Sequence, residues 1–229
     1  FDDKYGADNI IVSMAGKLDF DAMVDQINTC CGKWERTGAA RDYTPFKLHG
    51  GEFEQTIEDL HQHYLMMIMP SPSFQDERKY AAAALSSILG GGDGSRLHWA
   101  LVDTGLAEAA AASANASDMY GEQLAWAVCD KDNADTVAEI IQNEMMRVVS
   151  SLNQNDLDRV VAKAGTGAAI SSERPSGRMQ RLGSMIITGS EHVSLEEELA
   201  HIESLTINKL AEVAEEFPWI PVLTATTTG

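Results

Sequence analysis

The chain has 229 residues, 44% of them hydrophobic, which is enough for one large domain or for one domain and part of another. Its 17 basic and 35 acidic side chains give a formal charge of −18. This charge argues against binding to nucleic acid or to an anionic membrane surface and favours basic peptides as partners. No apolar run is long enough to predict a membrane span.

The signals for a cellular compartment are few. The first residues, Phe1–Lys4, lack the basic and apolar regions of a signal peptide, so we expect none in this chain, although a longer parent could have lost one. Of the three cysteines, Cys30 and Cys31 are adjacent and cannot easily pair, and Cys129 stands alone. This favours a cytoplasmic protein, with an exported or periplasmic parent as the alternative.

The N-terminal segment predicts one strand and one helix. A β-branched run over 9–15 ends at Gly16, and Asp19 is placed to cap a helix that reaches Cys31. Residues 36–46 then show no period and are rich in small and polar residues, which predicts a linker.

The next segment predicts two strands and two helices around a glycine-rich turn. Residues 52–58 are strand-like but polar, and 62–69 form an apolar strand that we expect Pro70 to stop. A helix over 76–89 follows. The second helix begins at Ser95 as its cap, and Gly105 closes it.

The rest of the chain predicts strands followed by helices. Residues 107–116 are alanine-rich and are assigned to a strand, and 123–129 alternate in polarity and size as a second strand. Helices are expected over 135–152, 155–170 and 206–217, together with one that starts at Pro175 and carries Ile186 and one that Ser194 opens and that carries Ile202. A closing strand is expected over 222–226. This order predicts an α+β fold in which helices cover one face of an antiparallel sheet.

Few residues suggest chemistry. His61 and His63 lie two apart on a predicted strand and are candidate metal ligands, although a chance pair is the commoner case. The chain contains no His-Glu-x-x-His motif, no inverted form of it and no Gly-x-Ser-x-Gly motif. The glycine-rich turn follows a helix rather than a strand, which argues against a phosphate-binding loop.

The turn does resemble a family signature. Leu89-Gly90-Gly91-Gly92-x-x-Ser95-Arg96-Leu97, followed by Gly105-Leu106-Ala107, is similar to the zinc-free C-terminal domain of the insulinase/pitrilysin zinc metallopeptidases. Other segments agree in order, among them Tyr5 to Gly16 and Ser172 to Leu195.

The resemblance implies one half of a metallopeptidase clamshell that encloses unfolded peptides. Residues 1–36 would be the end of a preceding, zinc-bearing type of domain, 37–45 a linker, and 46–229 the C-terminal non-catalytic domain. It implies no cofactor in this chain, with zinc in the parent's N-terminal domain or in a partner subunit, bound through an inverted His-x-x-Glu-His motif.

The resemblance also assigns residues to the substrate chamber, namely Gly91, Gly92, Arg96, Val102 and Glu108. Active relatives carry an Arg and a Tyr where this chain has Val102 and Glu108. Valine cannot donate a hydrogen bond to a substrate carbonyl, and a glutamate would bring negative charge towards an oxyanion. We therefore expect a chain without catalytic residues that shapes the peptide chamber of a metalloendopeptidase, or alternatively a protease-derived scaffold subunit with no proteolytic role.

Overall fold

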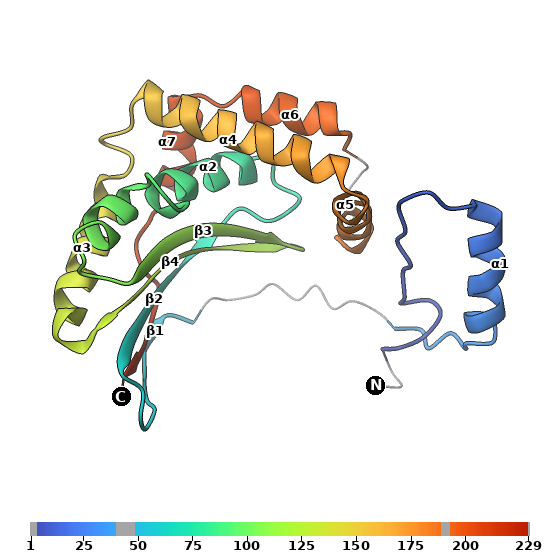
Figure 1. Ribbon diagram of the computed structural model, residues 1–229, viewed down its shortest axis with the longest axis horizontal. Coiled ribbons are helices and arrows are strands. Elements are labelled where there is room, and N and C mark those ends of the chain that lie inside the picture. The colour runs from blue at the N-terminus through green and yellow to red at the C-terminus, as the bar shows by residue number, and fades with distance from the viewer. Residues whose placement is uncertain (1–3, 40–48, 189–192, 229) are drawn as a thin grey trace. The chain divides into compact units, whose positions relative to one another are not determined.

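The structure is a computed structural model that describes residues 4–39, 49–188 and 193–228 (Figure 1). Its contacts divide the chain into two compact units, one of residues 1–45 and 167–195 and the other of 46–166 and 196–229. Most of the expected linker, 40–46, lies outside the described residues. The domain boundaries at 36 and 46 stay a prediction.

The larger unit is built on a five-stranded sheet in the order β1-β5-β2-β4-β3. The strands are β1 (Gly51–Thr56), β2 (Gln62–Ser71), β3 (Ala109–Ser117), β4 (Tyr120–Asp130) and β5 (Leu223–Thr228). All neighbours are antiparallel except β1 and β5, which run parallel. The predicted α+β class is confirmed.

Helices cover one face of this sheet. They are α2 (Lys79–Gly90), α3 (Ala134–Arg147), α4 (Gln154–Glu173), α6 (Leu195–Glu203) and α7 (Ile207–Glu216). Helices α2 and α3 contact the sheet, α7 packs against α2, and Figure 1 shows α4 and α6 on the same side, further out. The rings of Tyr80 and His201 stack with their centroids 4.9 Å apart, and this contact joins α2 to α6.

The core fills the space between the sheet and these helices. Its largest fully buried apolar side chains include Met67, Leu85, Ile88, Ile141 and Leu210. The polar side chain of Gln123 is also buried, and it donates to the carbonyls of Pro70 at 3.0 Å and Phe217 at 2.9 Å. This amide satisfies two carbonyls at the edge of the core, one from β2 and one from the end of α7.

Two expectations for this unit are resolved by strand pairing. The alanine-rich segment is β3, as predicted, because β4 pairs with it along its whole length. The expectation that Pro70 stops β2 is wrong, since the strand continues to Ser71. Proline is tolerated there because β5 pairs with β2 only over Tyr64–Ile68, which leaves Pro70 at an edge.

The smaller unit contains α1 (Phe20–Cys31) and α5 (Pro175–Ile187). Asp19 caps α1 as predicted, accepting from the Ala22 N–H at 3.0 Å. The predicted strand over 9–15 is wrong: it lies beside no partner strand among the described residues, and an unpaired run cannot complete its backbone hydrogen bonds. The segment contacts α5, where the Ser13 hydroxyl donates to the carbonyl of Met179 at 2.7 Å.

The smaller unit leaves many apolar side chains exposed. Helix α1 has no buried residue. The exposed apolar residues outside the helices are Tyr5, Ile10, Ile11, Val12, Met14, Leu18 and Trp34. The smaller unit therefore has no complete hydrophobic core among its described residues.

Across the described ranges, none of the helices combines the length and apolar character that a membrane span requires.

Candidate functional site

The two faces of the sheet carry different side chains. On the face under the helices, β4 presents Gln123, Ala125, Ala127 and Cys129, all of them buried. The larger residues of the same strand point to the opposite face. Helix α2 approaches β3 closely on this side, because a Cβ on Gly90 would overlap the backbone at Ala112.

The opposite face, which we call the open face, is apolar and accessible. Strand register aligns two apolar rows across it, Phe53–Ala225–Met66–Trp126–Ala111 and Gly51–Leu223–Ile68–Leu124–Ser113. Phe53 is 57% exposed and Met66 38% exposed, while Trp126 is half-buried. Within the larger unit, the described helices lie on the other side of the sheet (Figure 1). The face therefore offers an extended apolar surface of the kind that marks a binding site.

The charges of the open face are all acidic. The alternation of the strands places Glu122 and Asp130 on it, and no strand position facing this side is Lys or Arg. Its apolar rows thus lie between acidic side chains.

Glu108 reaches the open face through a local irregularity. Its N–H donates to the Val128 carbonyl at 2.9 Å, although the register pairs Val128 with Ala109. Two residues therefore oppose one, as in a β-bulge, and the extra residue is turned out of the regular alternation. The Glu108 carboxylate accepts from the Gln62 amide, whose own oxygen accepts from the Tyr64 hydroxyl at 2.9 Å.

The glycines of the turn end α2 and let the chain reverse. Gly91 follows the helix, and its carbonyl accepts from Lys163 of α4 at 2.6 Å. Gly92 has a φ of +95°, which glycine adopts without strain. The Ser95 hydroxyl accepts from the His98 N–H at 3.4 Å, in agreement with its predicted capping role, and Gly105 closes the turn with a φ of +74°.

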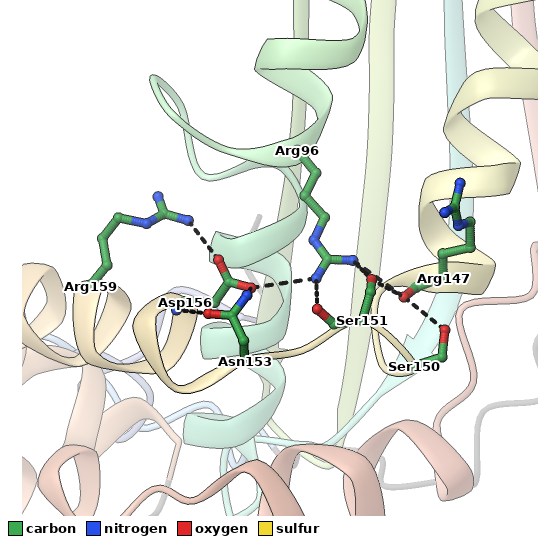
Figure 2. Close-up of polar contacts among 7 residues, drawn as sticks. All are labelled: Arg96, Arg147, Ser150, Ser151, Asn153, Asp156 and Arg159. Carbon is green, nitrogen blue, oxygen red and sulfur yellow. Dashed lines mark hydrogen bonds and ion pairs between the residues drawn. The ribbon is translucent and has the colours of Figure 1, made fainter.

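Arg96 holds the loop between α3 and α4 (Figure 2). Its guanidinium donates to the Ser151 hydroxyl at 2.7 Å and to the Ser151 carbonyl at 3.1 Å, and lies 3.6 Å from the Asp156 carboxylate. Asp156 is also 3.8 Å from Arg159 and accepts from Asn153 at 2.9 Å. Through these contacts, Arg96 has a structural role, because it holds the α3–α4 loop in the helical layer.

The sequence-predicted chamber residues thus lie in different places. Gly91, Gly92 and Arg96 are at the end of α2 and beside the α3–α4 loop, and Val102 is half-buried in a π-helical turn. Glu108 is exposed beside the open face. Their roles towards a substrate stay a prediction.

The histidine pair does not form a common site. His61 is exposed and precedes β2, whereas His63 is buried on the helix-covered face, and its Nδ1 has no hydrogen-bond partner among the described residues. His63 pairs across the sheet with Cys129, and burial raises the pKa of that thiol. Over residues 4–39, 49–188 and 193–228, no three His, Cys, Asp or Glu side chains are grouped so that they could hold a metal ion.

Sequence reasoning missed the open face, although the signal is present. The residues of β2 alternate Tyr64, Met66 and Ile68 with Leu65, Met67 and Met69, and both sets are apolar. A strand that is apolar on both faces indicates either burial on both sides or an exposed binding face.

Comparison with known proteins identifies the class. A sequence profile of the peptidase M16 inactive domain matches residues 1–164. The chain belongs to this family, which confirms the resemblance to insulinase/pitrilysin metallopeptidases.

Individual relatives agree. An uncharacterised zinc protease of Streptomyces coelicolor is 25% identical over 224 residues, covering 93% of this chain and 48% of the relative. A protease from Helicobacter pylori shares the fold with a TM-score of 0.81 and 17% identity, over 94% of this chain and 54% of the other. A chain of Complex III2 from Candida albicans also shares the fold, with a TM-score of 0.80 and 16% identity. The match covers 93% of this chain and 53% of that chain. The chain spans about half the length of the curated relatives it matches.

Proposed function

We propose that this chain is a non-catalytic domain that forms part of the peptide chamber of an M16-type zinc metallopeptidase. The observation that carries the proposal is the open face, an accessible apolar surface on a sheet whose other face is covered. Such a surface can hold an extended peptide through contacts with its side chains, without any catalytic group.

Zinc chemistry would belong to another domain or subunit. The described residues do not fit a zinc site, because they contain no group of three suitable ligands. The curated relatives named as zinc proteases are about twice as long as their match to this chain, which leaves room for a zinc-bearing domain. We propose that such a domain is the partner.

The smaller unit supports the same arrangement. Residues 9–15 have the composition of a strand but no partner strand among the described residues, and none of the side chains of α1 is fully buried. These residues have the composition of a strand and an amphipathic helix, but they lack a core of their own. This is what we expect of the end of a preceding domain, whose sheet the strand would complete. We therefore propose that residues 1–36 belong to the zinc-bearing domain.

A scaffold role is the second candidate. The fold also occurs in a chain of Complex III2 from Candida albicans, so it is compatible with a subunit of a larger assembly. The residues Val102 and Glu108, in place of the Arg and Tyr of active relatives, favour loss of a direct part in catalysis.

Two measurements on the purified chain test the proposal. Elemental analysis should find zinc far below one equivalent, and an unfolded fluorescein-labelled peptide should bind and be recovered intact. Stoichiometric zinc together with peptide cleavage would overturn the non-catalytic assignment. Failure to bind any unfolded peptide would favour the scaffold over the chamber domain.

A further inference from the structure

A carboxylate near the N-terminus of the smaller unit holds the start of the predicted linker. Asp8 accepts from the Thr37 N–H at 3.1 Å through one oxygen and from the Gly38 N–H at 2.9 Å through the other. Beside these bonds, the Ala7 N–H donates to the Glu35 carbonyl at 3.0 Å. The bonded residues are 29 and 30 positions apart, so this is a tertiary contact and not a helix cap. We call Asp8 and the two N–H groups the Asp8 clasp.

The backbone at the linker start is shaped for an anion. Gly38 has a φ of +66°, which glycine adopts without strain. Successive N–H groups in a turn of this kind form a concavity that binds negative charge. The N–H groups of Thr37 and Gly38 are the main cause that lowers the pKa of Asp8 below its ordinary value of 3.8. Asp8 is therefore charged at neutral pH, and both hydrogen bonds are charge-assisted.

A buried glycine makes room for the clasp. A Cβ on Gly6 would lie 2.5 Å from the Thr37 hydroxyl oxygen and 2.7 Å from an oxygen of Asp8, closer than packed atoms can approach. The turn that carries Gly6 is closed by the Asn9 N–H, which donates to the Gly6 carbonyl at 3.0 Å. The approach of residues 6–8 to residue 37 thus depends on the absence of a side chain at position 6.

We propose that the Asp8 clasp fixes the point at which the chain leaves the smaller unit and protects the Arg36–Thr37 peptide bond from proteases. Arg36 and Thr37 are exposed, so burial does not protect this bond. Exposed segments between domains are the preferred sites of proteolysis, and cleavage requires the segment to open locally. Without the clasp, residues 35–38 would be added to the linker and extend its reach by about 14 Å. The inference is independent of what the open face binds.

Limited digestion of the chain with trypsin tests the clasp, because trypsin cuts after arginine. Asp8→Asn keeps the shape of the side chain but leaves one acceptor oxygen, and its amide N–H groups meet a backbone donor. Mass spectrometry should show initial cleavage between Arg36 and Thr37 about five- to tenfold faster in this variant. Hydrogen exchange should show that the amides of Thr37 and Gly38 lose their protection, while those of β4 keep theirs.

Two further variants separate the clasp from general effects. Asp25→Asn removes the same charge from an exposed position on α1 of the same unit, and it should be cut at the rate of the unmodified chain. Gly6→Ala leaves the carboxylate in place but displaces Thr37 by overlap, and it should accelerate cleavage after Arg36 as well.

Unchanged cleavage after Arg36 in Asp8→Asn, with the circular dichroism spectrum of the folded chain, would overturn the proposal. Equal acceleration in Asp25→Asn would also overturn it, because the effect would then follow from charge alone. If Asp8→Asn does not fold, Gly6→Ala decides, and an unchanged rate in that variant contradicts the clasp. None of these outcomes involves peptide binding, so the proposed chamber role is tested separately.

Discussion

Single polar side chains attach the loops of this protein to its helical layer. Arg96 is the clearest example, because its guanidinium contacts the Ser151 hydroxyl, the Ser151 carbonyl and the Asp156 carboxylate. Its side chain is 17% exposed, so these bonds are largely shielded from water. The planar fork of arginine satisfies several acceptors that the single ammonium of lysine cannot reach together.

Arg96→Lys should therefore destabilise the chain by about 1–3 kcal/mol, the range for buried polar groups that lose a partner. Thermal unfolding measures the loss, and hydrogen exchange should speed up in the loop 148–153. Arg159→Lys is the control, because Arg159 is 42% exposed and its ion pair with Asp156 is long, at 3.8 Å. We expect a change below about 0.5 kcal/mol for it. Equal losses in the two variants would contradict the anchoring role.

A second residue couples stability to pH. The Asp76 carboxylate accepts from the Arg78 side chain at 2.6 Å and 2.9 Å and from the Arg78 N–H at 2.9 Å. The hydrogen bonds from the Arg78 side chain are the main cause that lowers the pKa of Asp76 below its ordinary value of 3.8. The charged form is thus stabilised in the folded state, and this contribution is present above pH 3.8 and lost as the pH falls through the lower, folded-state pKa.

Asp76→Asn should lower the melting temperature at pH 7 by a few degrees, corresponding to about 1 kcal/mol. The difference from the unmodified chain should shrink as the pH falls from 5 to below 3, because the unmodified carboxyl then becomes neutral as well. Calorimetry across this range measures it. A difference that stays constant with pH would contradict the assigned cause.

At the scale of elements, the approach of α2 to β3 sets the spacing between the helices and the sheet. A Cβ on Gly90 would overlap the backbone of Ala111 and Ala112, so the helix would have to move away from the strand. In α4, by contrast, a Cβ on Gly167 would have no heavy atom of the described residues within 4 Å, apart from its chain neighbours and the backbone of its own helix. Both glycines lie in helices, but Gly90 is packed tightly against a strand, whereas the Cβ position of Gly167 is open.

Gly90→Ala should lower stability by about 2 kcal/mol or more through overpacking, or prevent folding. Gly167→Ala should raise it by about 0.5–1 kcal/mol, because alanine is the better helix former. Urea unfolding monitored by circular dichroism gives both values. Similar effects of the two substitutions would show that the close approach of α2 to β3 has no energetic role.

The elements that could be predicted from the sequence are those whose pattern depends on local chemistry. The Asp19 cap, the turn at Gly105 and β3 all agree with the structure. The strand expected over 9–15 failed because a strand needs a partner that the pattern of one segment does not contain. The end of β2 was misplaced for a related reason, since tolerance of Pro70 depends on where β5 stops pairing.

At the scale of the whole molecule, the glycine motif indicated the family, but it did not indicate the open face. That face is defined by register across five strands, which brings Phe53, Met66 and Trp126 into one row from distant parts of the sequence. The position of Glu108 on it depends on a bulge, whose extra residue reverses the direction that simple alternation predicts.

The most direct test of the account is the effect of a charge at the centre of the open face on peptide binding. Met66→Asp should abolish binding of an unfolded apolar peptide while the circular dichroism spectrum stays that of the folded chain. Met146→Asp is the matched control, because Met146 is 67% exposed on α3 in the helical layer, and it should bind like the unmodified chain. Unchanged binding in Met66→Asp, or loss of binding in Met146→Asp alone, would contradict a peptide-binding role for the open face.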